Sequence, residues 1–228
     1  MTMVFPATEP STLPVVGSDH RFPVRRIYCV GRNYSDHAIE MGADPNKEPP
    51  FFFTKPADAV VPPNHPIKYP SKTEELHHEV ELVVALERGG TNVSVDAATA
   101  MIFGYAVGLD LTRRDLQKSA KEKGHPWCTA KAFDHSAVVG AITSHKDCGH
   151  LNEGLITLKI NQELKQSGNL NQMIWRIPEI ISKLSEYFSL QPGDLIFTGT
   201  PAGVGALERG DKLEAKIDKL SVLVTHVE

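Results

Sequence analysis

The segment His78-Glu79-Val80-Glu81-Leu82-Val83-Val84-Ala85-Leu86 joins a long apolar run to two carboxylates that stand two residues apart. The run from 80 to 86 predicts a β-strand, in which residues i and i+2 share a face. Like charges on one face repel and are costly to desolvate, so Glu79 and Glu81 need a cation, a basic partner or open water. Taken alone, the pattern favours the solvated face of an edge strand over a divalent metal site.

Composition limits the classes of protein to consider. A chain of 228 residues with 41% hydrophobic and 23% charged residues is globular and long enough for one domain with a sizeable core. The net charge of -4 gives no basic surface for nucleic acid. No apolar run approaches the length of a membrane span and no signal peptide is evident, so we expect a cytoplasmic protein without a membrane partner. Three cysteines at unrelated spacings are expected to be reduced.

The domain organisation expected is an extended N-terminal arm over residues 1–22, rich in Pro, Thr and Ser, followed by a single catalytic domain over residues 23–228. Strands outnumber helices and do not alternate with them, which predicts an α+β, β-rich class with an antiparallel or mixed sheet. Apolar residues at helical spacing predict a helix over 173–188. Strands are expected at 24–30, 49–56, 80–86, 102–110, 156–160, 163–166, 195–197, 213–217 and 222–227, the hairpin 156–166 turning at Asn161-Gln162.

Further polar groups stand at the ends of apolar runs. Asp110 ends the strand 102–110, whose two glycines indicate a close approach by a neighbour, and it is either a ligand or the N-cap of a helix over 113–123. Lys131 stands in an apolar context and is expected to reach a charge. Lys55 follows an apolar strand bracketed by prolines, and the preferred interpretation is that it protects a sheet edge.

A histidine and a carboxylate share one face of a short helix predicted over 36–41. His37 and Glu40 stand at i and i+3, which suits a general base held by a partner, but the spacing alone favours an ordinary surface ion pair. The glycine-rich loop 198–205 follows a strand but lacks the Lys-Ser/Thr of a P-loop, so nucleotide binding is not indicated.

Taken in order, these motifs resemble those of the fumarylacetoacetate hydrolase family over about residues 24–228. Each motif is weak alone, but their joint order is specific. The resemblance is to the short acylpyruvate hydrolase branch, and the opening Arg25–Tyr34 is similar to that of bacterial fumarylpyruvate hydrolases. The matching residues are Gly31-Arg32-Asn33-Tyr34, His37, Glu40, His78-Glu79-x-Glu81, Gly108-x-Asp110, Arg114, Asp115, Gln117, Ala130-Lys131 and Gly199-Thr200-Pro201-x-Gly203-Val204-Gly205.

The resemblance implies a mixed β-roll fold, a homodimer, and one Mg2+ or Mn2+ per subunit held by Glu79, Glu81 and Asp110. Ligation by oxygen alone suits those hard ions and argues against zinc. His37, oriented by Glu40, would take a proton from water, and Lys131 would polarise substrate oxygens beside the metal. The residues implied for binding the substrate's carboxylate and keto end are Arg114, Gln117, Gly199 and Thr200.

The activity implied by the resemblance is hydrolysis of the C–C bond of an acylpyruvate, a diketo acid of the fumarylpyruvate type met in aromatic degradation, to pyruvate and a carboxylic acid. Two alternatives use the same metal site, namely oxaloacetate decarboxylation and isomerisation of a diketo acid. A non-enzymatic binding protein is the third alternative, and the complete His37, Glu40 and Lys131 set speaks against it.

Overall fold

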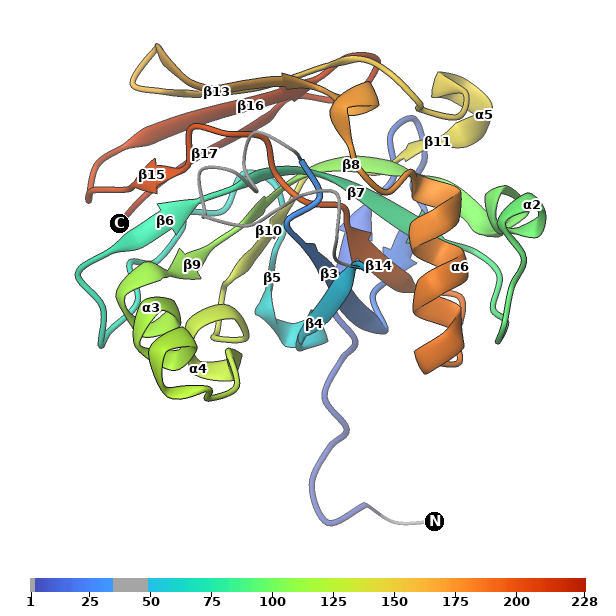
Figure 1. Ribbon diagram of the computed structural model, residues 1–228, viewed down its shortest axis with the longest axis horizontal. Coiled ribbons are helices and arrows are strands. Elements are labelled where there is room, and N and C mark those ends of the chain that lie inside the picture. Colours follow the sequence, from blue (N-terminus) through green and yellow to red (C-terminus); the bar gives the residue numbers. More distant parts are fainter. Residues whose placement is uncertain (1–2, 35–48) are drawn as a thin grey trace.

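A curled eight-stranded sheet forms the centre of the molecule in the computed structural model, which describes residues 3–34 and 49–228 (Figure 1). β14 runs parallel to β3 and β10 parallel to β5, while the other pairs of this sheet are antiparallel. The predicted β-rich, mixed class is therefore confirmed. In spatial order the strands are β4 (Phe51–Lys55), β3 (Arg26–Gly31), β14 (Asp194–Phe197), β7 (Val80–Leu86), β8 (Ile102–Asp110), β10 (Ala137–Val139) and β5 (Val60–Val61), with β11 (Thr143–Ser144) also on β8.

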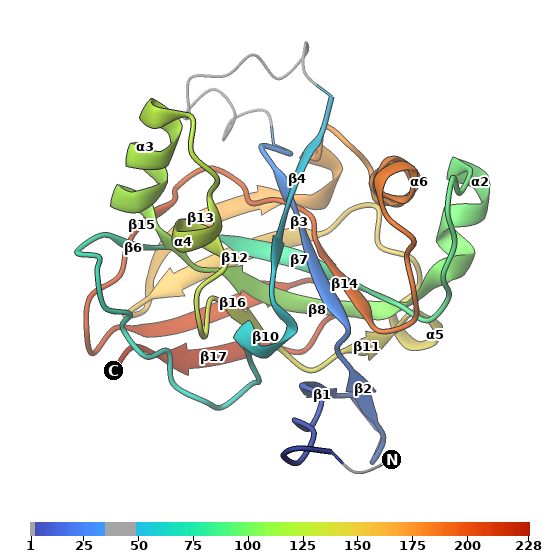
Figure 2. The same cartoon turned by 90° about the horizontal axis from the view of Figure 1, so that it is seen from below.

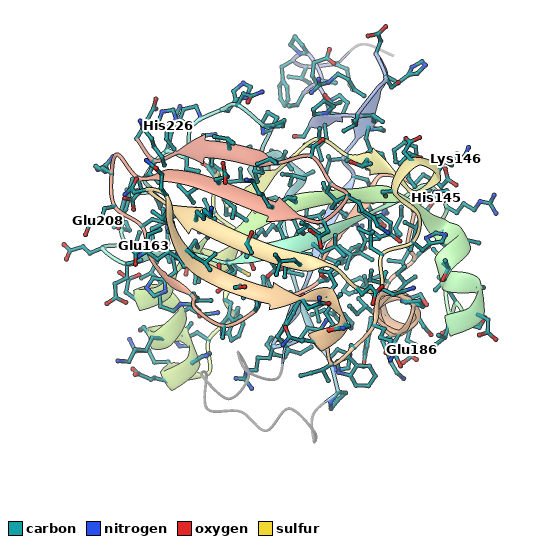
Figure 3. The ribbon with its side chains drawn as sticks, turned by 90° about the horizontal axis from the view of Figure 1, so that it is seen from above. His145, Lys146, Glu163, Glu186, Glu208 and His226 are labelled. Atoms are coloured by element: carbon teal, nitrogen blue, oxygen red, sulfur yellow. The ribbon has the colours of Figure 1, made fainter. Side chains whose placement is uncertain are left out.

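A four-stranded antiparallel sheet covers one face of the curled sheet (Figures 1 and 3). Its strands are β13 (Glu163–Asn169), β12 (Leu155–Ile160), β16 (Lys212–Ile217) and β17 (Leu223–His226). The predicted hairpin is present, because β12 pairs antiparallel with β13, and its two turn residues, Asn161 and Gln162, have left-handed backbone with φ values of 50° and 72°. Ile156 and Leu158 of β12 are fully buried and join the core between the two sheets.

Strand β7 is buried on both of its faces, and all seven of its residues are covered. Val80, Leu82, Val84 and Leu86 belong to the core between the sheets, whereas Val83 and Ala85 belong to a second core on the opposite face. Glu81 is on the same face as Val83 because side chains alternate along a strand. The carboxylate therefore stands at the end of an apolar core, which excludes a solvated edge strand for this segment.

The helices lie beside the sheets on two sides, with α3 and α4 on one side and α2 and α6 on the other (Figure 2). The predicted helix over 173–188 is present as α6, and it begins only at Ile177 because Pro178 occupies its first turn. The helix predicted over 113–123 is α3, whose N-cap is Arg113, so Asp110 is not a helix cap. The helices are α2 (Val95–Ala98), α3 (Arg114–Lys123), α4 (Cys128–Lys131), α5 (His145–Cys148) and α6 (Ile177–Tyr187), with 3-10 turns η1 (Ala57–Ala59), η2 (Thr99–Met101) and η3 (Leu170–Gln172).

Within the N-terminal segment, β1 (Thr12–Pro14) and β2 (Arg21–Pro23) pair with each other. Leu13 is fully buried in the second core. A further small sheet consists of β15 (Gly205–Ala206), β6 (Leu76–His78) and β9 (Thr112–Arg113). The three cysteines are free thiols, as expected. Among residues 3–34 and 49–228, no helix has the length and apolar character needed to cross a bilayer.

Both glycines of β8 face close neighbours, as predicted. A Cβ added at Gly104 would lie 2.2 Å from the backbone oxygen of Thr143, and one added at Gly108 would lie 2.5 Å from Val83 Cγ2. We expect Gly104→Ala to lower the free energy of unfolding by about 1–3 kcal/mol. Gly108→Ala should lower it less, because the side chain of Val83 can move away from an added methyl group more easily than the paired backbone of Thr143 can. Denaturant unfolding measures both.

The control is Gly205→Ala, where an added Cβ meets only His78 Nε2 at 3.4 Å. Its stability is expected to remain within about 0.5 kcal/mol of the wild type, as for most substitutions away from tight packing. Equal stabilities for the variants at Gly104 and Gly205 would contradict the close approach of β11 to β8.

Candidate active site

Three carboxylates meet at the ends of β7 and β8. Glu79 and Glu81 share one face of the chain, and Asp110 is brought level with them by the hydrogen bond from its backbone N–H to Glu79 O at 2.9 Å. One oxygen from each carboxylate lies within 4.8 Å of the others. The residues are only 5%, 2% and 1% exposed, so bulk water does not solvate them. The structure thus brings together the three residues singled out in the sequence.

Lys131 at the end of α4 reaches this cluster, as its apolar context predicted. Its Nζ donates hydrogen bonds to Glu79 Oε2 and to Asp110 Oδ2, both at 2.8 Å. Burial disfavours the ammonium, but Asp110 and Glu79 outweigh it and raise the pKa of Lys131. The lysine is therefore charged and offsets part of the repulsion between the carboxylates.

Lys55 is a second buried cation, and its interpretation as an edge-protecting residue was wrong. Its side chain is fully buried, with Nζ 2.7 Å from Asp110 Oδ1. It also donates hydrogen bonds to the backbone oxygens of Leu111 and Lys131. Lys55 is the last residue of β4, which stands at the end of the strand order beside β3, and no spacing in the sequence indicated its contact with Asp110 on β8. Lys55 thus ties the end of β8 to α4.

Glu81 is a buried carboxylate that faces the carboxylates of Glu79 and Asp110. Burial raises the pKa of Glu81 well above its ordinary value, and the neighbouring Asp110 and Glu79 raise it further. The backbone N–H of Gly199 donates to Glu81 Oε2 at 2.7 Å and opposes this shift, as does Lys131. Because the anionic form of Glu81 is unfavourable in these surroundings, a bound cation would stabilise it.

Arg114 and Gln117 lie on the first turns of α3, next to Glu79. Arg114 donates from Nη2 to Glu79 Oε1 and from Nη1 to Gln117 Oε1, each at 2.5 Å. Its Nε also lies 3.3 Å from His77 Nδ1. Burial and the Arg114 guanidinium lower the pKa of His77 to about 4, so this histidine is neutral at pH 7. Both residues predicted to bind substrate border the cleft described below.

The loop after β14 closes the other side of the carboxylate cluster. The Thr200 hydroxyl donates to Val80 O at 2.7 Å and accepts from Gln166 Nε2 at 2.8 Å. Gln166 also accepts from the Val80 backbone N–H and contacts His78 Nδ1 at 2.9 Å. The predicted Gly199-Thr200 loop is present beside the carboxylates, but Gln166 was missed, because it lies on a distant hairpin strand and has no motif around it.

A cleft opens above the carboxylates, and the residues predicted around it come together there. Its lining residues include Arg32, Phe51, Phe53, Glu79, Glu81, Asp110, Arg114, Gln117, Lys121, Trp127, Lys131, Gly199 and Thr200. His37 and Glu40 lie outside the described residues, as does the short helix predicted over 36–41. Their roles stay predictions.

The donor set fits a hard divalent cation. Three buried carboxylates supply only oxygen ligands, which suits Mg2+ or Mn2+ better than zinc. Asp110 Oδ1 forms an ion pair with Lys55 Nζ, but this contact does not have the geometry of a hydrogen bond. Within residues 3–34 and 49–228, no donor forms a hydrogen bond with this oxygen. An acceptor oxygen therefore remains available in a group of like charges that a dication would neutralise.

Known proteins are similar to this chain in sequence and in structure. A fumarylpyruvate hydrolase from Pseudomonas aeruginosa, whose crystal structure is in complex with Mn2+ and pyruvate, is 49% identical, with 99% of each chain covered and a TM-score of 0.98. Fumarylpyruvate hydrolase from Ralstonia sp is 43% identical over 78% of this chain and 92% of that protein. Oxaloacetate tautomerase FAHD1, mitochondrial, from Rattus norvegicus is 45% identical over 85% of this chain and 87% of that protein.

Residues 26–228 match the family described as Fumarylacetoacetate (FAA) hydrolase C-terminal, which covers the two packed sheets and every described residue of the carboxylate cluster. The family resemblance seen in the order of the motifs is confirmed: the chain belongs to the fumarylacetoacetate hydrolase family.

Proposed function

We propose that the protein is a divalent-metal-dependent hydrolase that cleaves the C–C bond of an acylpyruvate, with fumarylpyruvate as the first substrate to test. The observation that carries the proposal is the buried group of Glu79, Glu81 and Asp110, in which Lys131 bridges Glu79 and Asp110. Its support from relatives is the fumarylpyruvate hydrolase that binds Mn2+ and pyruvate and shares 49% of its residues with this chain. Pyruvate is the product that such a cleavage would leave.

The metal in this proposal is Mg2+ or Mn2+, held by Glu79, Glu81 and Asp110. When bound, a divalent cation polarises carbonyl oxygens and stabilises the negative charge that develops on them. The protein's own contribution is to hold three carboxylates in a dry site, where like charges are unfavourable without a cation.

The reaction adds water across one C–C bond. The hydroxyl of water goes to the distal carbonyl carbon, the electron pair of the broken bond goes to the methylene carbon of the pyruvyl part, and that carbon then gains a proton. Lys131 is positioned to donate a hydrogen bond to an oxygen that gains charge during this step, since its ammonium is already at the carboxylates. His37, oriented by Glu40, is proposed to take the proton from the water.

At the pyruvyl end of the substrate, we propose that Arg114 and Gln117 bind the carboxylate and the adjacent keto oxygen. Both side chains line the cleft, and the 2.5 Å contact between them holds the guanidinium in one orientation. A guanidinium with its plane fixed is suited to a carboxylate because it presents paired N–H groups.

A second candidate activity is tautomerisation of oxaloacetate. It is favoured by the rat oxaloacetate tautomerase, which is 45% identical to this chain. The same metal and Lys131 would stabilise an enol or enolate without any attacking water. The two activities therefore differ in their need for a base that activates water.

Replacing one carboxylate tests the proposed metal site. We expect Glu81→Gln to abolish Mn2+ binding in calorimetry, because a neutral amide removes one anionic ligand. In the wild type, Mn2+ at about one hundred times its Kd should raise the stability by about 2.7 kcal/mol, and the variant should lose that increase. Without metal, Glu81→Gln should be at least as stable as the wild type, because it removes a buried charge that burial and two neighbours disfavour.

The matched control is Glu163→Gln, which changes a carboxylate whose side chain is 71% exposed on β13. It should keep both the Mn2+ affinity and the thermal shift. Unchanged Mn2+ binding by Glu81→Gln would mean that the carboxylate cluster is not the metal site.

The reaction itself is tested by following the loss of diketo absorbance of fumarylpyruvate and the formation of pyruvate, with Mn2+ and with a chelator. We expect metal-dependent cleavage, and we expect His37→Asn to lower kcat by about 10²–10⁴-fold, the usual contribution of a general base. The variant should still bind Mn2+ as the wild type does.

Oxaloacetate separates the two candidate activities. Tautomerisation of oxaloacetate should survive His37→Asn better than hydrolysis does, because it requires no activated water. If the wild type fails to cleave fumarylpyruvate and acetylpyruvate with either metal, the hydrolase proposal is wrong, and metal-dependent tautomerisation would then be the better description.

A further inference from the structure

Three aromatic side chains that line the cleft, Phe51, Phe53 and Trp127, form an aromatic wall. The rings of Phe51 and Trp127 meet edge to face at a centroid distance of 5.4 Å, and those of Phe53 and Trp127 at 5.9 Å. Phe51 and Phe53 belong to β4, whereas Trp127 precedes α4. The wall therefore joins two separate elements on one side of the cleft that contains the carboxylates.

Each ring of this wall has a cation near it. Arg32 Cζ is 5.6 Å from the centroid of Phe51, Lys121 Nζ is 5.6 Å from that of Trp127, and Lys131 Nζ is 5.1 Å from that of Phe53. Contacts of this kind hold a cation in place without neutralising its charge. The wall thus presents positive charge to the cleft at three points.

These cations differ in what they already bind. Lys131 contacts the carboxylates of Glu79 and Asp110, and Arg114, which also lines the cleft, contacts that of Glu79. Lys121, near the end of α3, has no carboxylate partner among residues 3–34 and 49–228. It is partly buried, and burial, Arg32 and Arg114 together lower the pKa of Lys121 by more than the Glu79 carboxylate raises it. The position of Lys121 is therefore one that an anion would stabilise.

The charges that the described residues place around the cleft lead to the same conclusion. Among residues 3–34 and 49–228, four cationic side chains and three carboxylates line it, and a divalent cation bound to those carboxylates would make it more positive still. The carboxylate of a pyruvyl group offsets only one of these charges. A substrate with a second carboxylate therefore complements the positive electrostatic potential of the cleft better than a substrate that ends in a methyl group.

We propose that Lys121, backed by Trp127 and beside Arg32, is a specificity-determining residue that binds the second carboxylate of a dicarboxylate substrate. This inference rests on the proposed function, because it places the pyruvyl end of the substrate at the metal-binding carboxylates. Fumarylpyruvate carries such a second carboxylate on its acyl group, and acetylpyruvate does not. A methyl end would leave the half-buried ammonium without a counter-charge, which is how the site would reject it.

The test compares these two substrates with Mn2+-loaded wild type, Lys121→Gln and Lys121→Arg. Loss of one charged hydrogen bond predicts that Lys121→Gln raises KM for fumarylpyruvate by roughly tenfold to a hundredfold more than KM for acetylpyruvate. Lys121→Arg should restore most of the preference, since it keeps the charge. Lys123→Gln is the matched control, because it removes an exposed lysine from the same helix, and its KM ratio should equal that of the wild type.

A KM ratio unchanged by Lys121→Gln, or an equal loss on both substrates in a variant that keeps its Mn2+ affinity and Tm, would overturn the inference while hydrolysis stands. If the wild type cleaves neither compound, the hydrolase proposal fails separately. Calorimetric titration of the Mn2+-loaded protein with the uncleaved pair then decides: tighter binding of fumarylpyruvate that is lost in Lys121→Gln supports the subsite, and equal affinities for both compounds overturn it.

Discussion

The mutual repulsion of three buried carboxylates is the constraint around which this molecule is built. Pairing of β7 with β8 brings Glu79, Glu81 and Asp110 to one point, where water cannot solvate them. Two buried lysines offset the repulsion. Lys131 belongs to α4 and Lys55 to β4, so ion pairs with the carboxylates connect these two elements. A site of this kind costs stability, and a bound dication would return part of that stability while supplying chemistry.

The same elements also shape the surroundings of the proposed substrate. β4 carries Lys55 towards the carboxylates and Phe51 and Phe53 towards the cleft, and the segment leading into α4 contributes Trp127 beside them. Positive charge is thereby placed at both ends of one cleft, close to the carboxylates and near its aromatic wall. In the proposed function, the reaction takes place at the carboxylates, and Lys121 beside the aromatic wall selects the acyl group.

The sequence predicts those features of the structure that depend on residues close together in the chain, and not those that depend on distant residues. The bounds of β7 and β8 follow from largely apolar runs, broken within β7 only by Glu81, and the hairpin turn follows from Asn161-Gln162, because these signals lie within a few residues. Whether Glu79 and Glu81 are buried depends on neighbouring strands and on the second sheet. Lys55 was misinterpreted for the same reason, since its contact with Asp110 joins β4 to β8, two strands that are not neighbours in the sheet.

The central claim is that the three carboxylates hold a divalent cation, and anomalous diffraction from crystals grown with Mn2+ tests it most directly. The account predicts one anomalous peak per chain, within about 2.0–2.6 Å of an oxygen from each of Glu79, Glu81 and Asp110, the range of oxygen ligands around hard dications. A peak bound elsewhere, or no peak while Lys131 still bridges Glu79 and Asp110, would contradict it.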